Sequence, residues 1–455
     1  MRRHLILIPI LLLLLLAGAW YWVSRPDVAQ LSVEAVSGRV PQITDPREQF
    51  YPTIAVAPAV GWPSGGKPRA AAGLQVAAFA GGLSHPRWLY RLPNGDVLVA
   101  ETNSPPRSGG GISGMVERSL MHAAGADAPS ANRITLLRDA NGDGVAESRS
   151  VFLTGLNSPT GMALLGDWLY VANTDALVRY PFHAGETRIT ARPEKIVSLP
   201  GGGAHWARNL IASPDGKTLF VGVGSSTNIA ENGLDAEGSV YAKGAPGSAS
   251  GNRAAILQVD PATRTATIFA WGLRNPNGMA IEPHSGNLWA VVNERDMLGS
   301  DVPPDYLTQV DLGTFYGWPW NYWGGHVDHR VQPERPDLLE YSKRPDFALG
   351  PHVAPLGLAF ASDAKLGAAF ANGAFVGEHG SWNREPVSGY KVVFVPFADN
   401  GFPVRDAKPV DVLTGFLDAR GKAQGRPVGV ITDATGALLV ADDVGNVVWR
   451  VSAAK

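Results

Sequence analysis

Short apolar segments recur in pairs along most of the chain, and each pair encloses a turn rich in Gly, Asp or Asn. The first pair covers residues 86–90 and 97–100, and its turn reads Pro93-Asn94-Gly95-Asp96. Asn-Gly and Asp-Gly turns between apolar segments are typical of β-hairpins. The pattern returns five more times, over residues 159–171, 208–222, 276–291, 355–377 and 427–441. Each occurrence predicts one hairpin, and most begin at a proline.

The hairpins follow one another at intervals of roughly 50 to 80 residues, which indicates one large repeated unit. A β-sandwich would show turn signals about every 8 to 12 residues, and a parallel α/β fold would place helical patterns between the strands. Neither pattern is present. The spacing therefore predicts an all-β fold, a six-bladed β-propeller over residues 76–455, with one antiparallel sheet in each blade.

A different pattern occupies the N-terminus. Arg2 and Arg3 precede residues 5–23, which carry no charge and end on an aromatic cluster. About 20 apolar helical residues span a bilayer, and flanking basic residues stay in the cytoplasm. A cleavable signal peptide is the alternative, because small residues occur at 17–19. Residues 1–24 are thus predicted to be a transmembrane anchor or signal helix, and residues 25–75 a tether and irregular lead-in. The propeller would lie in a bacterial periplasm, held at the inner membrane or released.

The composition adds mainly exclusions. Hydrophobic residues make up 45% of the chain and charged residues 18%, which is enough apolar material for a large core. The net charge of -2 offers no basic footprint for nucleic acid. The absence of cysteine excludes disulfides, thiolate metal sites, cysteine nucleophiles and covalently attached c-type haem. The common hydrolase, metalloprotease and P-loop motifs are also missing from the sequence.

Propellers bind ligands at the central channel, so polar residues beside the hairpins are the candidates for chemistry. His205 follows three glycines ahead of the third hairpin, and neutral imidazole is a natural proton acceptor near pH 7. Arg274 and Asn275 precede the fourth hairpin, and Arg426 precedes the sixth. This set favours a polyanionic ligand. The structural alternatives are a hydrogen-bonded loop histidine and arginines that bridge neighbouring blades.

Two acidic segments could hold a hard cation. Residues 293–305 combine carboxylates with loop carbonyls that suit Ca²⁺, and a solvated acidic loop is the alternative. Residues 139–144 match the start of an EF-hand loop, but Ser150 stands at the twelfth position and no helices flank it. A plain Asp-Gly turn is therefore favoured there. The aromatic cluster at 316–323 favours packing over stacking on a ligand, and residues 378–384 are unusually polar for a segment after a strand.

Together these residues resemble the quinoprotein aldose dehydrogenases, the family of soluble glucose dehydrogenase and sorbosone dehydrogenase. The resemblance covers residues 76–455 and implies a six-bladed propeller that holds pyrroloquinoline quinone (PQQ) and Ca²⁺ over its channel. Its most specific parts match in order and spacing; they are His205 ahead of Leu210-Ile211-Ala212-Ser213-Pro214-Asp215-Gly216, then Gly272-Leu273-Arg274-Asn275-Pro276-Asn277-Gly278, Tyr316-Gly317-Trp318-Pro319 and Pro351-His352-Val353-Ala354-Pro355.

The resemblance also implies a role for each matched residue. His205 is expected to be the general base that takes the C1 hydroxyl proton of an aldose. Arg274 and Asn275 are expected to bind the cofactor near its reactive carbonyl, and Arg426 to clamp a PQQ carboxylate. The metal loop maps to Arg295 and Asp296, where the family mainly uses backbone carbonyls.

Three positions depart from the family pattern. The carboxylate that orients the catalytic histidine falls near Ser225, so a serine or another group must orient His205. The cofactor lysine has no clear equivalent, and Arg384 is the nearest candidate. A second clamp arginine appears as Val428. The glucose specificity of the soluble enzyme is therefore not implied for this chain.

The function implied by the resemblance is PQQ- and Ca²⁺-dependent oxidation of an aldose or related aldehyde at C1, to a lactone or acid, with a hydride passed to PQQ. A separate cytochrome or membrane quinone is the expected electron acceptor, because the chain cannot attach a haem through cysteine. A calcium-dependent propeller lactonase and a non-catalytic binding propeller are the alternatives.

Overall fold

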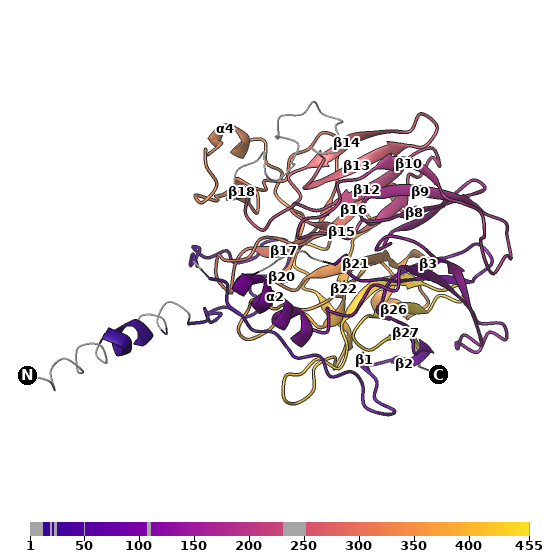
Figure 1. The fold of residues 1–455 in the computed structure, drawn as a ribbon, viewed down its shortest axis with the longest axis horizontal. Coiled ribbons are helices and arrows are strands. Elements are labelled where there is room, and N and C mark those ends of the chain that lie inside the picture. Colours follow the sequence, from indigo (N-terminus) through magenta and orange to yellow (C-terminus); the bar gives the residue numbers. More distant parts are fainter. Residues whose placement is uncertain are drawn as a thin grey trace, which may run out of the picture.

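The computed structural model describes residues 12–18, 21, 25–49, 51–106, 111–230 and 252–454. Its strands form six antiparallel sheets of four or five strands and one small two-stranded sheet, and the six larger sheets confirm the predicted six-bladed β-propeller (Figure 1). The inner strand of each sheet contacts the inner strands of both neighbouring sheets, so the sheets close into a ring. Each predicted hairpin supplies the two innermost strands of one blade. The segments that lead into the inner strands therefore gather at one end of the ring.

The first three blades have four strands each. Their strands, from the channel outward, are β3 (Pro86–Arg91), β4 (Val97–Glu101), β5 (Arg133–Arg138) and β6 (Ser148–Leu153) in blade 1; β7 (Met162–Leu165), β8 (Trp168–Ala172), β9 (Ala176–Pro181) and β10 (Glu194–Ser198) in blade 2; and β11 (Leu210–Ala212), β12 (Leu219–Val223), β13 (Ala255–Asp260) and β14 (Thr265–Trp271) in blade 3. The helix α2 (Gly111–Ala123) lies in the connection between β4 and β5.

The other three blades carry additions. Blade 4 is β15 (Pro276–Ile281), β16 (Leu288–Val292), β17 (Pro304–Gln309) and β20 (Phe347–Pro351), with β18 (Asn321–Tyr322), β19 (His326–Val327) and α4 (Pro336–Leu339) in its last connection. Blade 5 is β21 (Pro355–Phe360), β22 (Gly373–Glu378), β23 (Lys391–Pro396), β24 (Val410–Thr414) and β1 (Arg69–Ala70). Blade 6 is β25 (Pro427–Thr432), β26 (Leu438–Asp442), β27 (Val447–Ala453) and β2 (Leu74–Gly81).

A strand from the N-terminal side closes the ring. β2 pairs antiparallel with β27, from Leu74 opposite Ala453 to Gly81 opposite Val447. The two ends of the propeller therefore share blade 6, and the boundary predicted at residue 76 falls inside β2. This closing pair is visible in Figure 1, where β2 and β27 lie side by side near the C-terminus.

Apolar side chains fill the spaces between neighbouring sheets. One cluster between blades 5 and 6 contains Phe375, Phe394 and Trp449, and burying each such side chain contributes about 1.5–3 kcal/mol. Close to the channel the backbones themselves meet. A Cβ atom on Gly161 would lie 2.3 Å from the backbone nitrogen of Leu210 in the next blade. The glycine near the start of this hairpin therefore allows adjacent inner strands to approach.

The lead-in that the sequence predicts as a tether packs against the propeller. Its backbone N–H groups donate to the carbonyls of Leu298, Trp382 and Ala423, at 2.7–2.9 Å. The Arg47 guanidinium pairs with Asp27 at 2.6 Å within the lead-in and with Asp301 at 2.8 Å in the loop after β16. Residues of this segment thus form part of the folded body and lie over loops at one end of the ring.

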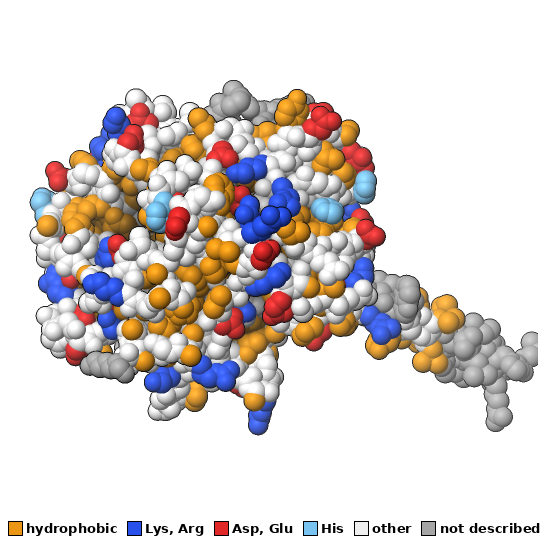
Figure 2. All heavy atoms as spheres, turned by 180° about the vertical axis from the view of Figure 1, so that it is seen from behind, with side chains coloured by type: hydrophobic (Ala, Val, Ile, Leu, Met, Phe, Trp, Pro, Cys, Tyr) orange, Lys and Arg blue, Asp and Glu red, His pale blue; other side chains and the backbone are white. Residues whose placement is uncertain are grey.

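Within the described residues, no helix has the length and apolar character that crossing a bilayer requires. The anchor predicted over residues 5–23 lies largely outside the described residues and stays a prediction. On the face seen in Figure 2, Lys and Arg side chains are interspersed with Asp and Glu.

Two motifs from the sequence have structural roles in the fold. Residues 139–144 form the predicted turn between β5 and β6, where the Asp139 carboxylate accepts hydrogen bonds from the backbone of Gly142 (2.7 Å) and Gly144 (2.9 Å). The aromatic cluster at 316–323 is packed into the interior, because its Trp and Tyr side chains are only 0–6% exposed. The packing interpretation of that cluster is confirmed.

Candidate active site

His205 and Asn275 meet at Gly224, at the end of the propeller where the inner strands begin. His205 precedes β11, Gly224 follows β12 and Asn275 precedes β15. A Cβ atom on Gly224 would lie 2.4 Å from Asn275 Oδ1 and 2.5 Å from His205 Cβ. Only glycine leaves room there for both side chains, which are themselves half-buried. The structure therefore brings two of the predicted site residues together.

The His205 ring is held at Nδ1. This atom lies 2.8 Å from the carbonyl oxygen of Ser225 and 3.1 Å from its hydroxyl, which in turn donates to Thr227 O at 2.7 Å. A carbonyl oxygen can only accept, so Nδ1 carries the proton and Nε2 keeps its lone pair. Ser225 thus occupies the place where the family resemblance puts an orienting carboxylate.

Positive charge surrounds His205. Burial lowers the pKa of His205 well below its usual range, and the charges of Arg274, Arg208 and Arg253 lower it further. Arg208 and Arg253 are buried and donate to backbone carbonyls of residues 200–202, among others. The imidazole is therefore neutral at neutral pH, and its surroundings favour an anionic ligand.

Arg274 connects this pair to the predicted metal loop. Its Nε and Nη2 atoms donate to the carbonyl (3.0 Å) and side-chain oxygen (2.8 Å) of Asn228. Its Nη1 donates to the carbonyls of Glu294 (2.6 Å) and Asn293 (3.3 Å). The guanidinium is 3.8 Å from an oxygen of Asp296. Arg274 thus braces the loop after β16 against the loop after β12.

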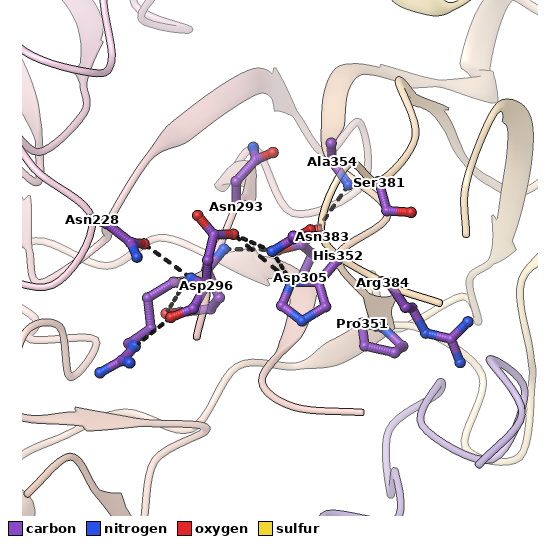
Figure 3. A network of polar contacts seen from close by, with 12 residues as sticks. Asn228, Asn293, Asp296, Asp305, Pro351, His352, Ala354, Ser381, Asn383 and Arg384 are labelled. Carbon is purple, nitrogen blue, oxygen red and sulfur yellow. Dashed lines mark hydrogen bonds and ion pairs between the residues drawn. The ribbon is translucent and has the colours of Figure 1, made fainter. Parts of the chain in front are cut away.

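Asp296, Asn383 and His352 form a second polar group (Figure 3), and its Asp296 lies 3.8 Å from the Arg274 guanidinium. Asn383 Nδ2 donates to Asp296 Oδ1 at 2.5 Å and lies 3.2 Å from His352 Nδ1. His352 Nε2 is 2.9 Å from the carbonyl of Gly299, so Nε2 carries the proton and Nδ1 accepts from Asn383. The Asp296 N–H donates to Asn228 Oδ1 at 2.9 Å. The network joins blades 3, 4 and 5.

The predicted metal residues Arg295 and Asp296 lie between β16 and β17. The Arg295 guanidinium pairs with the buried Asp328 and donates through Nε to the carbonyl of Asp296 at 2.9 Å. Among the described residues, no hydrogen bond donor contacts the Arg295 carbonyl. That carbonyl and the Asp296 carboxylate, whose side chain is 17% exposed, are oxygens that this loop can offer to a cation.

Two buried carboxyl groups support the same loop. Asp305 accepts hydrogen bonds from the backbone of Glu294 (2.7 Å) and of Ala354 (2.8 Å). Burial raises the pKa of Glu294 and of Asp305 to about 7 in each case, although Arg274 opposes both shifts. The loop therefore rests on two carboxyl groups whose protonated forms are favoured by burial.

The remaining two predicted residues serve the lead-in. Arg384 donates to the carbonyls of Ser300 (3.0 Å), Pro386 (2.6 Å) and Leu31 (3.0 Å). Figure 3 shows its guanidinium directed away from Asp296. Arg426 lies over the ring of Tyr390 at 4.9 Å and donates to Ala57 O at 3.3 Å. The described residues show no contact from either arginine to His205, so their cofactor roles stay predictions.

Several residues of this arrangement are not predicted from the sequence. Asn383 falls in the polar segment after β22, and His352 falls in the matched Pro-His-Val-Ala-Pro motif, so both carry a sequence signal without an assigned role. Gly224 and Asn228 carry no such signal. Their importance depends on contacts with residues far away in the chain, which a local pattern cannot show.

Comparisons with known proteins identify the family. The TrAA12-like family model matches residues 127–306 and 338–454, about two thirds of the chain. A pyrroloquinoline quinone-dependent pyranose dehydrogenase of Coprinopsis cinerea is 27% identical over an alignment of 231 positions that covers 40% of this chain and 31% of that protein. The chain spans about half the length, or less, of the first curated relatives that it matches.

Solved structures share the fold of the chain. The holo PQQ domain of the C. cinerea pyranose dehydrogenase superposes with a TM-score of 0.65 at 22% identity, over 85% of this chain and 97% of that one. A calcium structure of a Trichoderma reesei enzyme of family AA12 gives 0.66 at 20% identity, over 88% and 99%. At such low identity the structures show the fold alone. The family model, which matches more than half of the sequence, shows that the chain belongs to the TrAA12-like family.

Proposed function

We propose that this protein is a PQQ-dependent dehydrogenase that oxidises an aldose sugar or a related aldehyde at C1. The observation that carries the proposal is the meeting of His205 and Asn275 at Gly224, with the histidine held as a neutral base. The family membership and the PQQ-dependent pyranose dehydrogenase of C. cinerea support the assignment.

The residues present fit PQQ, a planar quinone with three carboxylates. Arg274, Arg208 and Arg253 provide positive charge beside His205. The side-chain amide of Asn275 is half-buried and makes no hydrogen bond with the described residues, so it is available to a quinone oxygen. Arg274 and Asn275 would hold the reactive end of the cofactor close to His205.

The chain's own contribution to the reaction is proton transfer. When bound, PQQ supplies a quinone that accepts a hydride equivalent from C1. His205 Nε2 would accept the proton of the C1 hydroxyl, because Ser225 holds the other ring nitrogen in its protonated form. Loss of that proton together with a hydride converts the C1 hydroxyl to a carbonyl, which in a pyranose is a lactone. The neighbouring arginines disfavour the imidazolium, so His205 would release the proton readily.

The proposal includes Ca²⁺ at the loop after β16. The Arg295 carbonyl and the Asp296 carboxylate would be its protein ligands, and the ion would act as a Lewis acid toward the quinone. The calcium structure of the T. reesei relative supports this choice. Chelation should abolish activity of the reconstituted enzyme, and Ca²⁺ should restore it. Full activity in excess chelator would contradict a role for calcium.

The proposed electron acceptor is a separate cytochrome or membrane quinone. A chain without cysteine cannot attach a haem through cysteine, which supports an acceptor on another molecule. The proposed location is the bacterial periplasm, with the charge-free segment at residues 5–23 as anchor or signal. This placement rests on the N-terminal sequence alone.

Reconstitution tests the function. The purified protein is incubated with PQQ and Ca²⁺, and reduction of an artificial dye is followed with a panel of aldoses and aldehydes. Dye reduction that requires both PQQ and a sugar is the expected result. A protein that binds PQQ but reduces no dye with any member of the panel would overturn the proposal. Hydrolysis of a lactone with Ca²⁺ alone would instead support the lactonase.

A further inference from the structure

One arginine and two histidines surround Asp443, where blades 1, 5 and 6 meet. Asp443 follows β26, and its side chain is 1% exposed. One oxygen, Oδ2, lies 2.6 Å from Arg87 Nη1, 2.9 Å from His379 Nε2 and 3.4 Å from His85 Nε2. The other oxygen has no hydrogen bond partner among the described residues. The proposed proton transfer at His205 does not use this cluster.

Arg87 makes fewer hydrogen bonds to the protein than Arg274 and Arg384 do. Arg274 and Arg384 each donate through Nε, Nη1 and Nη2 to oxygens of the protein. In the described part of the chain, Arg87 makes one hydrogen bond, from Nη1 to Asp443. Its side chain is 14% exposed. Its Nε–H and Nη2–H groups therefore remain available to a ligand.

Arg87 also contacts the residue that follows the proposed catalytic base in the chain. Its guanidinium lies over the ring of Trp206, 5.5 Å from the centroid, and Trp206 directly follows His205 in the chain. A cation stacked on an aromatic face keeps the N–H groups at its edge free to bind in the plane of the guanidinium. Asp443 and Trp206 thus fix the orientation of Arg87 from two sides.

A second arginine, Arg426, acts electrostatically on this cluster. Burial lowers the pKa of Arg87, the charge of Asp443 raises it, and the charge of Arg426 lowers it. Burial lowers the pKa of His85 to about 4 and also lowers that of His379, so both imidazoles are neutral. The Arg87 guanidinium is then the charged partner of the Asp443 carboxylate. An anionic ligand at the free edge of Arg87 would also be attracted by the charge of Arg426.

We propose that Arg87 binds a carboxylate of PQQ, and that Asp443 positions the guanidinium for this contact. The inference rests on the proposed function and deepens it, because it adds a binding residue from blade 1. It also gives a PQQ carboxylate a partner in this chain, where Val428 stands at the position of the family's second clamp arginine. The backbone places the two positions together: a Cβ on Gly429, next to Val428, would lie 2.8 Å from Arg87 O.

Direct binding of PQQ to the full-length apo protein tests the proposal without relying on activity. Kd is measured by equilibrium dialysis for the wild type, Arg87→Gln and Arg91→Gln. Losing a charge-assisted pair of hydrogen bonds should raise Kd roughly 10- to 100-fold in Arg87→Gln. Arg91, in the same strand, pairs with the exposed Asp363 at 3.0 Å, so its variant should change Kd less than about 3-fold.

The trimethyl ester of PQQ separates a ligand contact from a structural effect. Because the ester has no carboxylate, wild type and Arg87→Gln should bind it within about 3-fold of each other. If Arg87→Gln fails to fold, Arg87→Lys retains the charge that Asp443 faces, and about 5-fold weaker binding of PQQ but not of the ester is expected.

Three results would overturn the inference. Equal affinity of wild type and Arg87 variants for PQQ would remove the contact. Equal losses for PQQ and for the ester would show a structural role only. If the wild type does not bind PQQ at all, both the proposed function and this inference are overturned. This result can be distinguished from the first two, in which the wild type binds PQQ.

Discussion

Gly224→Ala changes the site by one methyl group. A Cβ at this position would lie 2.4 Å from Asn275 Oδ1, 2.5 Å from His205 Cβ and 3.1 Å from His205 Cγ. Ordinary contact begins near 3.4 Å, so the neighbouring groups must move by about 1 Å. Gly224 does not have a left-handed backbone conformation, so the effect is steric and not conformational. The methyl group acts directly on the pair that carries the proposed chemistry.

This displacement sets the expected losses of rate and of stability in Gly224→Ala. A misplacement of about 1 Å in a catalytic arrangement costs on the order of 100-fold in rate, and overpacking of a filled site costs about 1–3 kcal/mol of stability. After reconstitution with PQQ and Ca²⁺, we expect kcat/KM to fall roughly 100-fold in a protein that still unfolds cooperatively. Gly81→Ala is the matched control, because nothing lies within 4 Å of its Cβ position. A Gly224→Ala enzyme with at least a third of the wild-type kcat/KM would refute the reasoning.

Three further predictions concern stability and protonation. Arg47→Met should lower the free energy of unfolding in urea by about 1–2 kcal/mol, because it breaks the ion pairs to Asp27 and Asp301 that hold the lead-in; an unchanged value would mean that the lead-in is not held there. Burial raises the pKa of Glu378 from 4.5 to about 8. The stabilisation by protonated Glu378 is complete below pH 4.5 and is lost as the pH rises through 8. Glu378→Gln should therefore melt a few degrees above wild type at pH 9 and at the same temperature as wild type at pH 4.5. A variant that melts at the wild-type temperature at both pH values would contradict this. Burial and Arg274 hold the pKa of His205 well below 6.5, so its imidazole NMR signals in the apo protein should show no protonation between pH 8 and 6.5; a midpoint in that interval would refute the assignment.

The sequence predicts the blades well because their signal is local and repeated. Each apolar pair and its turn lie within a short stretch of chain, and each of the six pairs forms the two innermost strands of one blade. The closing strand β2 is missed because its partner β27 lies at the other end of the chain. The lead-in is missed for a similar reason: Arg47 has no local pattern that would indicate its partner Asp301, 254 residues later.

Prediction of the site is limited in the same way, because contacts between distant parts of the chain leave no local pattern. His205, Arg274 and Asn275 are found because each stands just ahead of a recognisable hairpin. Asn383 and Asp296 are 87 residues apart, and Arg87 and Asp443 are 356 apart. Such pairs form only when the ring closes, so their chemistry becomes visible in three dimensions. The positive surroundings of His205 arise in the same way, from arginines contributed by different loops.

The most direct test of the account is His205→Ala, measured together with PQQ binding. The variant should bind PQQ with a Kd within about 3-fold of wild type, and its kcat for sugar-dependent dye reduction should fall at least about 100-fold, because the general base is gone. His183→Ala is the control, since that side chain is 80% exposed. A His205→Ala enzyme that binds PQQ and keeps more than a tenth of the wild-type kcat would contradict the central claim.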